Sequence, residues 1–179
     1  MLVATKKRKE NIAEYILYMF QVEDLIRAFE FDKDKIEEFV VRQYAMPELE
    51  QIEIAGWYQN LSLMMVKEGL KENGHLQVLL NLINDLEGFH LKVVQSDNHQ
   101  EYSAIYKAVA GVINEFNKKS GKSSGDIGAC INALYMYLML KLQKKIVSAE
   151  TTEAMQSFGQ LLSKLSSLYK EYETGNLEL

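Results

Sequence analysis

The sequence predicts an all-α protein, a single-domain antiparallel helical bundle of about seven helices over residues 1–179. The chain contains one proline, the residue that most strongly breaks helices. Apolar residues recur at three- and four-residue steps nearly throughout, and no segment is typical of a strand. A length of 179 residues, 47% of them hydrophobic and 25% charged, suits one globular domain with a sizeable core.

Breaks in the apolar periodicity divide the chain into the expected helices. Their approximate ranges are 8–30, 32–46, 47–72, 75–95, 98–119, 126–147 and 148–174. Residues 1–8 precede them and are expected to form a frayed basic terminus. Asp34 and Glu37 have capping-box spacing at the start of the second helix, and Pro47 suits the first turn of the third. Asn73-Gly74 ends the third helix, because both residues tolerate the left-handed conformation.

The remaining helices also begin and end at small or polar residues. Asn98 and Glu101 have capping-box spacing at the start of the fifth helix. The small polar stretch 120–125 is the expected linker before the sixth helix, and Ser148 caps the last one. Short connections favour antiparallel neighbours. The third and sixth helices are apolar around most of their circumference, so we expect them at the centre, with the fifth and seventh outside.

Charge and cysteine content exclude several classes of protein. A net charge of −5 argues against nucleic-acid binding, and the basic run Lys6 to Lys9 is short enough to be a solvated end. The single cysteine, Cys130, excludes an intrachain disulfide and a multi-thiolate metal site. It lies in an apolar segment, so we expect a buried, inert thiol.

No segment is expected to enter a membrane. The most apolar stretch, residues 127–140, contains Asn132 and falls short of the roughly 20 apolar residues that a span requires. The N-terminal region has no small-residue cleavage site, and Glu14 interrupts its apolar stretch. These observations favour a cytoplasmic protein, which would keep Cys130 reduced.

Three stretches of the chain carry a family resemblance. They are KRKENIAEYILYM at residues 7–19, EDLIRA at residues 23–28, and the run with Trp57-Tyr58, Met64-Met65 and Glu68-Gly69. Together they resemble a family of uncharacterised bacterial proteins from Bacteroides-type anaerobes, catalogued as a domain of unknown function. The resemblance spans about the whole chain and implies a bacterial, helical, single-domain protein. It supplies no catalytic or binding residues.

The sharpest chemical pattern is the Glu-x-x-His step formed by Glu87 and His90. Such a step places a carboxylate and an imidazole on one helix face, and di-metal carboxylate bundles use two of them with two further glutamates. Here the step occurs once, with Glu23 as a further candidate ligand. We therefore favour a core histidine hydrogen-bonded to a neighbouring side chain, with Glu87 at the helix edge, and predict no metal site.

Two further patterns have structural interpretations. Glu23 and Arg27 lie one helical turn apart and can pair, and a buried Glu23 would require a partner. We favour a polar network that fixes the register of the helices over a catalytic role. Gly121-Lys122-Ser123-Ser124 matches the last residues of the P-loop motif. Phe116 stands where the motif requires its first glycine, and no strand precedes the segment, so we interpret it as a loop.

The sequence thus favours a non-enzymatic protein without a cofactor that acts through contact with a protein partner or with itself. The expected sixth helix is apolar on more sides than the core can cover, because it carries Tyr135, Tyr137 and Met139. Near the C-terminus, Tyr169 and Tyr172 are also suited to contact with a partner. Self-association as a homodimer stays open beside a separate partner. The alternative is a helical bundle that binds a ligand or a metal, with or without enzymatic activity.

Overall fold

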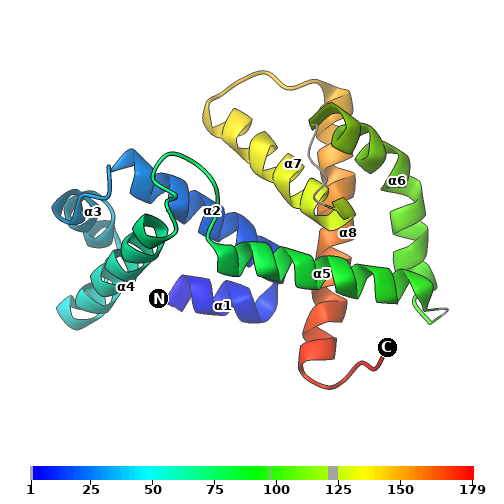
Figure 1. Ribbon diagram of the computed structural model, residues 1–179, viewed down its shortest axis with the longest axis horizontal. Coiled ribbons are helices and arrows are strands. Elements are labelled where there is room, and N and C mark those ends of the chain that lie inside the picture. The colour runs from blue at the N-terminus through cyan, green and yellow to red at the C-terminus, as the bar shows by residue number, and fades with distance from the viewer. Residues whose placement is uncertain (1, 97, 121–124) are drawn as a thin grey trace.

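The computed structural model of the protein describes residues 2–96, 98–120 and 125–179, which form helices joined by short connections (Figure 1). Over these residues the chain has eight α-helices, no strand, and one 3-10 turn, η1 (Val41–Gln43). The helices are α1 (Leu2–Glu10), α2 (Ile12–Ala28), α3 (Lys33–Phe39), α4 (Glu48–Lys67), α5 (Gln77–Gln95), α6 (Gln100–Ser120), α7 (Gly125–Leu142) and α8 (Ala149–Glu173). The all-α prediction is confirmed, and the number of helices is close to the expected seven.

The additional helix arises at Asn11, which divides the expected first helix into α1 and α2. The backbone of Asn11 is extended, and its side-chain oxygen accepts a hydrogen bond from the N–H of Glu14 at 3.1 Å. Asparagine is among the preferred N-cap residues because this bond satisfies a free donor in the first turn. Residues 5–11, which precede α2, are all polar, so apolar periodicity could not show that a separate helix lies there.

Helix α1 differs from the frayed basic terminus expected at residues 1–8. Ala4 is buried, and Arg8 donates two hydrogen bonds, of 2.8 and 2.7 Å, to the Glu173 carboxylate at the end of α8. This bidentate pair raises the pKa of the Arg8 guanidinium and joins the two ends of the described chain.

Helix α8 lies at the centre and packs against α1, α2, α5, α6 and α7 (Figure 1), so its expected place on the outside was wrong. Leu161, Leu162 and Leu165 form its buried stripe. The sequence was misleading because small polar residues on the flanks of this stripe allow close helix contact. Ser166 is itself buried, and its hydroxyl oxygen accepts the N–H of Ala13 on α2 at 3.3 Å.

Helix α4, expected at the centre, lies instead at the periphery. With α3 it forms a lobe at one end of the molecule, at the left of Figure 1, and it packs on α2 and α3. Its inward residues Ile54, Tyr58, Leu61 and Met65 are buried. Helix α4 is apolar on most sides but is buried on only some of them, because its neighbouring elements cover only part of its surface.

Helix α7 is central in its first half only, where the residues from Ile127 to Ile131 are buried. None of the helices in the described parts of the chain combines the length and apolar character needed to cross a membrane. The P-loop-like residues Gly121 to Ser124 lie outside the described residues.

Candidate functional site

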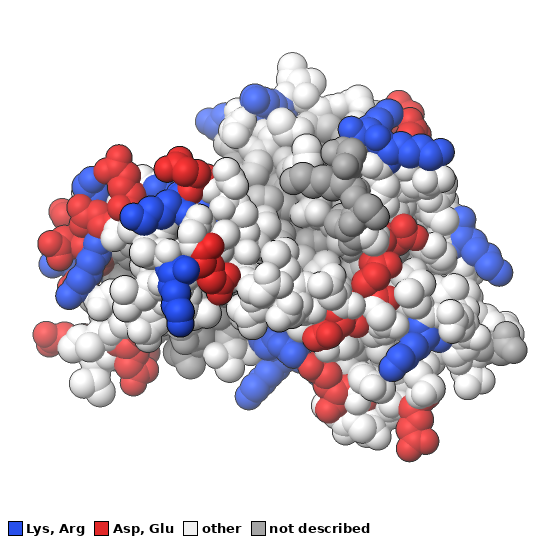
Figure 2. All heavy atoms as spheres, in the orientation of Figure 1, with Lys and Arg blue, Asp and Glu red and all other residues white. Residues whose placement is uncertain are grey.

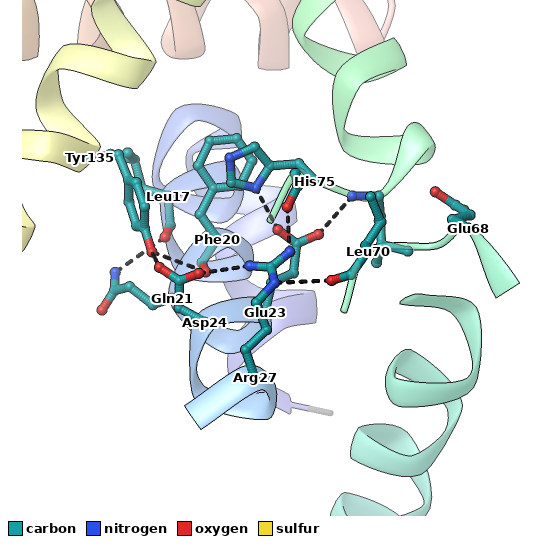
Figure 3. Close-up of polar contacts among 12 residues, drawn as sticks. Leu17, Phe20, Gln21, Glu23, Asp24, Arg27, Glu68, Leu70, His75 and Tyr135 are labelled. Atoms are coloured by element: carbon teal, nitrogen blue, oxygen red, sulfur yellow. Dashed lines mark hydrogen bonds and ion pairs between the residues drawn. The ribbon is translucent and has the colours of Figure 1, made fainter. Parts of the chain in front are cut away.

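A buried polar network surrounds Glu23 on α2 (Figure 3). Glu23 is 0% exposed, and its carboxylate accepts the backbone N–H of Leu76 at 2.8 Å. Nδ1 of His75 donates to the other carboxylate oxygen at 2.6 Å, and the imidazole stacks on Phe20 with ring centroids 3.5 Å apart. Glu23 thereby fixes the point at which the chain enters α5.

Asp24 and Arg27 extend this network to the connection between α4 and α5 and to α7 (Figure 3). Arg27 donates to Asp24 at 2.7 Å, to the carbonyl oxygen of Leu70 at 3.1 Å, and to that of Gly74. Asp24 also accepts the hydroxyl of Tyr135 on α7. Burial, followed by this hydrogen bond, raises the pKa of Tyr135, so the phenol stays protonated.

The predicted pair of Glu23 with Arg27 was wrong, since each binds a different partner. Glu23 lies on the inward side of α2 and meets His75, whereas Arg27 pairs with Asp24. The requirement that a buried Glu23 have a partner is confirmed. His75 could not be assigned from spacing, because its contact with Glu23 depends on a connection about fifty residues away, whereas Asp24 lies three residues from Arg27.

A second polar cluster surrounds His90 on α5. His90 is 1% exposed, and its Nδ1 lies 2.6 Å from the hydroxyl of Tyr102 on α6. The ring also packs edge-on against Tyr106, with centroids 4.6 Å apart. Burial lowers the pKa of His90, although the charges of Glu87 and Asp126 oppose this effect. This is the hydrogen-bonded core histidine that the structural interpretation of the sequence expects.

Glu87, one turn before His90, caps the N-terminus of α7. Its carboxylate accepts the backbone N–H groups of Asp126 at 3.1 Å and Ile127 at 2.8 Å. These donors have no partner within their own helix, and the positive end of the helix dipole favours an anion here. Gly125 has a φ of +71° and faces the Glu87 carboxylate so closely that a Cβ atom would occupy the same space. Glycine is therefore required at this position.

Asp126 and Cys130 complete the second cluster. Asp126 accepts the hydroxyl of Tyr106 at 2.6 Å, and this bond, together with burial, raises the pKa of Tyr106 to about 12. Burial raises the pKa of the Cys130 thiol, which disfavours the reactive thiolate. The phenol of Tyr106 and the thiol of Cys130 thus stay protonated. Tyr102, Tyr106 and Asp126 were not identified from the sequence, because their contacts join three helices.

The structure does not bring the three candidate metal ligands together. Glu87 and His90 belong to the cluster at the start of α7, whereas Glu23 belongs to the network at the start of α5. Within the described ranges, no group of three or more histidine, cysteine, aspartate or glutamate side chains is placed to hold a metal ion. Each candidate instead contacts backbone N–H groups or aromatic hydroxyls, which are structural partners.

Replacement of Glu87 by Ala should lower the free energy of unfolding by about 1–2 kcal/mol, because two backbone donors at the start of α7 lose their acceptor. Urea denaturation measures this change, and hydrogen exchange at the Ile127 amide should become faster. Asp85→Ala, at an exposed position of the same helix, is the matched control and should change stability by less than about 0.5 kcal/mol. Equal effects of the two substitutions would contradict the capping role.

Exposed apolar side chains also lie on α4, on the side away from α2. A stripe of residues at three- and four-residue steps runs the length of the helix and is called the α4 stripe below. Its members are Leu49, Ile52, Gly56, Gln59, Leu63 and Val66. Leu49, Ile52 and Leu63 are 74%, 63% and 68% exposed.

The α4 stripe borders a groove between α3 and α4. Lys33, Ile36 and Glu37 of α3 line one wall, and residues of the stripe line the other. In Figure 2 charged side chains crowd the α3 side of this lobe, while acidic groups separated by uncharged atoms mark the outer end of α4. The part beside Tyr58 has a volume of about 290 Å³, at the lower limit for small-molecule pockets. No buried charged side chain among the described residues lines it.

The fold and these clusters define an all-α protein whose polar side chains secure helix ends and whose α4 stripe is exposed. The chain belongs to the family described as Domain of unknown function (DUF4924), whose model matches residues 1–176. No curated protein and no solved structure matches the chain.

Proposed function

We propose that this protein is a non-enzymatic binding protein that acts through protein–protein contact at the α3–α4 lobe. The observation that carries the proposal is the exposure of Leu49 and Ile52 at one end of the α4 stripe and of Leu63 and Val66 at the other. Exposed apolar side chains grouped on one helix face are typical of interaction sites, because leaving them in water costs free energy that a partner recovers.

The polar clusters support this assignment. Glu23, Glu87 and His90, the candidates with the strongest chemical pattern, each hold a helix end or an aromatic hydroxyl. Catalysis needs side chains free to meet a substrate, whereas these are occupied by the protein itself. The buried thiol of Cys130 suits a reducing compartment, and the sequence resemblance points to bacteria, so the proposed setting is the bacterial cytoplasm.

The proposal is tested by placing a photo-activated cross-linking amino acid at Leu63 in the full chain and irradiating cells that express it. Leu91 on α5 is the matched control, because it is 51% exposed compared with 68% for Leu63 but lies on another helix. We expect covalent protein adducts from position 63 and a much smaller yield from position 91. Equal yields from the two positions, or no adduct at position 63, would overturn the proposal.

A further inference from the structure

We infer that the partner of α4 is a second copy of this chain, with the two α4 helices packed antiparallel along their stripes. This inference rests on the proposed binding role of α4 and names the occupant. Three properties of α4 support this dimer: the order of residues in its stripe, the distribution of its charges, and the space beside it.

The α4 stripe is self-complementary when one copy is reversed. Successive members are separated by three, four, three, four and three residues, the spacing of a coiled-coil seam. A two-fold axis between residues 57 and 58 places Leu49 opposite the partner's Val66. The same axis places Ile52 opposite the partner's Leu63.

At the centre of the same arrangement, Gly56 lies opposite the partner's Gln59. No atom lies within 4 Å of the position that a Cβ of Gly56 would occupy, so this point of the helix leaves room for a long side chain. Apolar residues thus meet apolar residues at both ends, and a small residue meets a large one at the centre. A different protein would not require this symmetry, whereas a two-fold dimer does, because each residue pair occurs twice.

The charges of α4 select the antiparallel orientation. Glu48, Glu50 and Glu53 lie in its N-terminal third, whereas Lys67, Glu68, Lys71 and Glu72 at and just beyond its C-terminus balance one another in charge. An antiparallel pair places the acidic end of each helix beside the electrically balanced end of the other, and the helix dipoles also oppose favourably. A parallel pair would place three carboxylates beside three, which is unfavourable.

The groove gives the second copy a place to bind. Ile52, Gly56, Gln59, Leu63 and Val66 line it together with residues of α3. Each α4 can therefore lie against the partner's α3 as well as its α4, which yields four helices in contact. A helix of 20 residues is about 30 Å long, and we expect the contact to bury on the order of 1,200 Å² in total. That area is at the lower end for specific interfaces, so the dimer should be reversible.

Sedimentation velocity of the purified full chain over a range of concentrations provides the first test. We expect a concentration-dependent equilibrium between monomer and dimer. Leu63→Glu should raise the dissociation constant roughly a hundredfold, because the dimer would bury two added charges. The control Leu91→Glu adds the same charge on α5 and should leave the equilibrium unchanged. A monomer at every concentration up to several hundred micromolar would overturn the inference.

Orientation and register are tested by cross-linking with a short bismaleimide. Ile52→Cys and Leu63→Cys proteins should each remain largely uncross-linked alone, and a mixture of the two should give a covalent dimer. The wild type should give none, because Cys130 is buried. A covalent dimer of Ile52→Cys alone would indicate a parallel pair and would overturn the inference. Adducts with other proteins at position 63 in cells, combined with a monomeric purified chain, would refute the second copy but retain the binding role.

Discussion

Replacement of Glu23 by Ala should lower the free energy of unfolding by about 3–5 kcal/mol. The carboxylate is fully buried, so its removal leaves the Leu76 N–H and the His75 imidazole without their acceptor and opens a cavity between α2 and α5. Urea denaturation at neutral pH measures the loss. Hydrogen exchange at the Leu76 amide should also become faster. The free energy of opening that protects this amide should fall by a similar amount, because its acceptor on α2 is gone.

Two variants separate this effect from a general sensitivity to substitution. Glu23→Gln keeps an oxygen acceptor for the Leu76 N–H and should lose distinctly less stability than Glu23→Ala. Glu10→Ala, at an exposed glutamate, should stay within about 0.5 kcal/mol of the wild type. If Glu23→Ala costs less than about 1 kcal/mol, the carboxylate does not organise the connection into α5.

The second large effect is expected at His90, whose replacement by Ala should cost about 3 kcal/mol. The substitution removes a buried ring that packs on Tyr106 and leaves the hydroxyl of Tyr102 without its partner in the core. Thermal and urea denaturation measure this cost. His99→Ala is the matched control, because His99 is partly exposed at the start of α6, and it should have a small effect.

The same residue gives stability a definite pH dependence. Burial lowers the pKa of His90 below its ordinary value of about 6.5, so the unfolded chain takes up the proton at a higher pH than the folded one. The stabilising contribution is present above about pH 6.5 and is lost as the pH falls further. The difference in stability between wild type and His90→Ala should therefore be smaller at pH 5 than at pH 7.5. An unchanged difference would contradict a buried neutral imidazole.

Much of the fold could be predicted because helix ends carry local chemical signals. Pro47 and Ser148 mark helix starts that the structure places at Glu48 and Ala149, and the break at Asn73-Gly74 lies within the connection between α4 and α5. Each signal depends on residues within one turn, which a sequence displays directly. The break at Asn11 was missed because the residues before it are polar and show no apolar periodicity that would indicate a helix.

The layers and the site were harder to predict because they depend on contacts between distant segments. The pattern of α4 and that of α8 each show apolar faces, but only the packed chain shows that α8 has five neighbouring helices and α4 few. Likewise Glu87 and His90 were recognised as a pair of interest. Their partners Asp126 and Tyr102 lie on other helices, and nothing in the local spacing identifies them.

The bonds of Arg27 have a consequence for how this family can vary. Arg27 lies at the end of α2 and holds the carbonyl oxygens of Leu70 and Gly74, so the chain leaves and re-enters the body of the molecule at nearly one point. The segment between these two points, which includes α3 and α4, therefore forms a lobe whose two ends are held together by Arg27. Its outward residues can change over evolution without altering the packing around α8, so this lobe and the body of the molecule can diverge at independent rates.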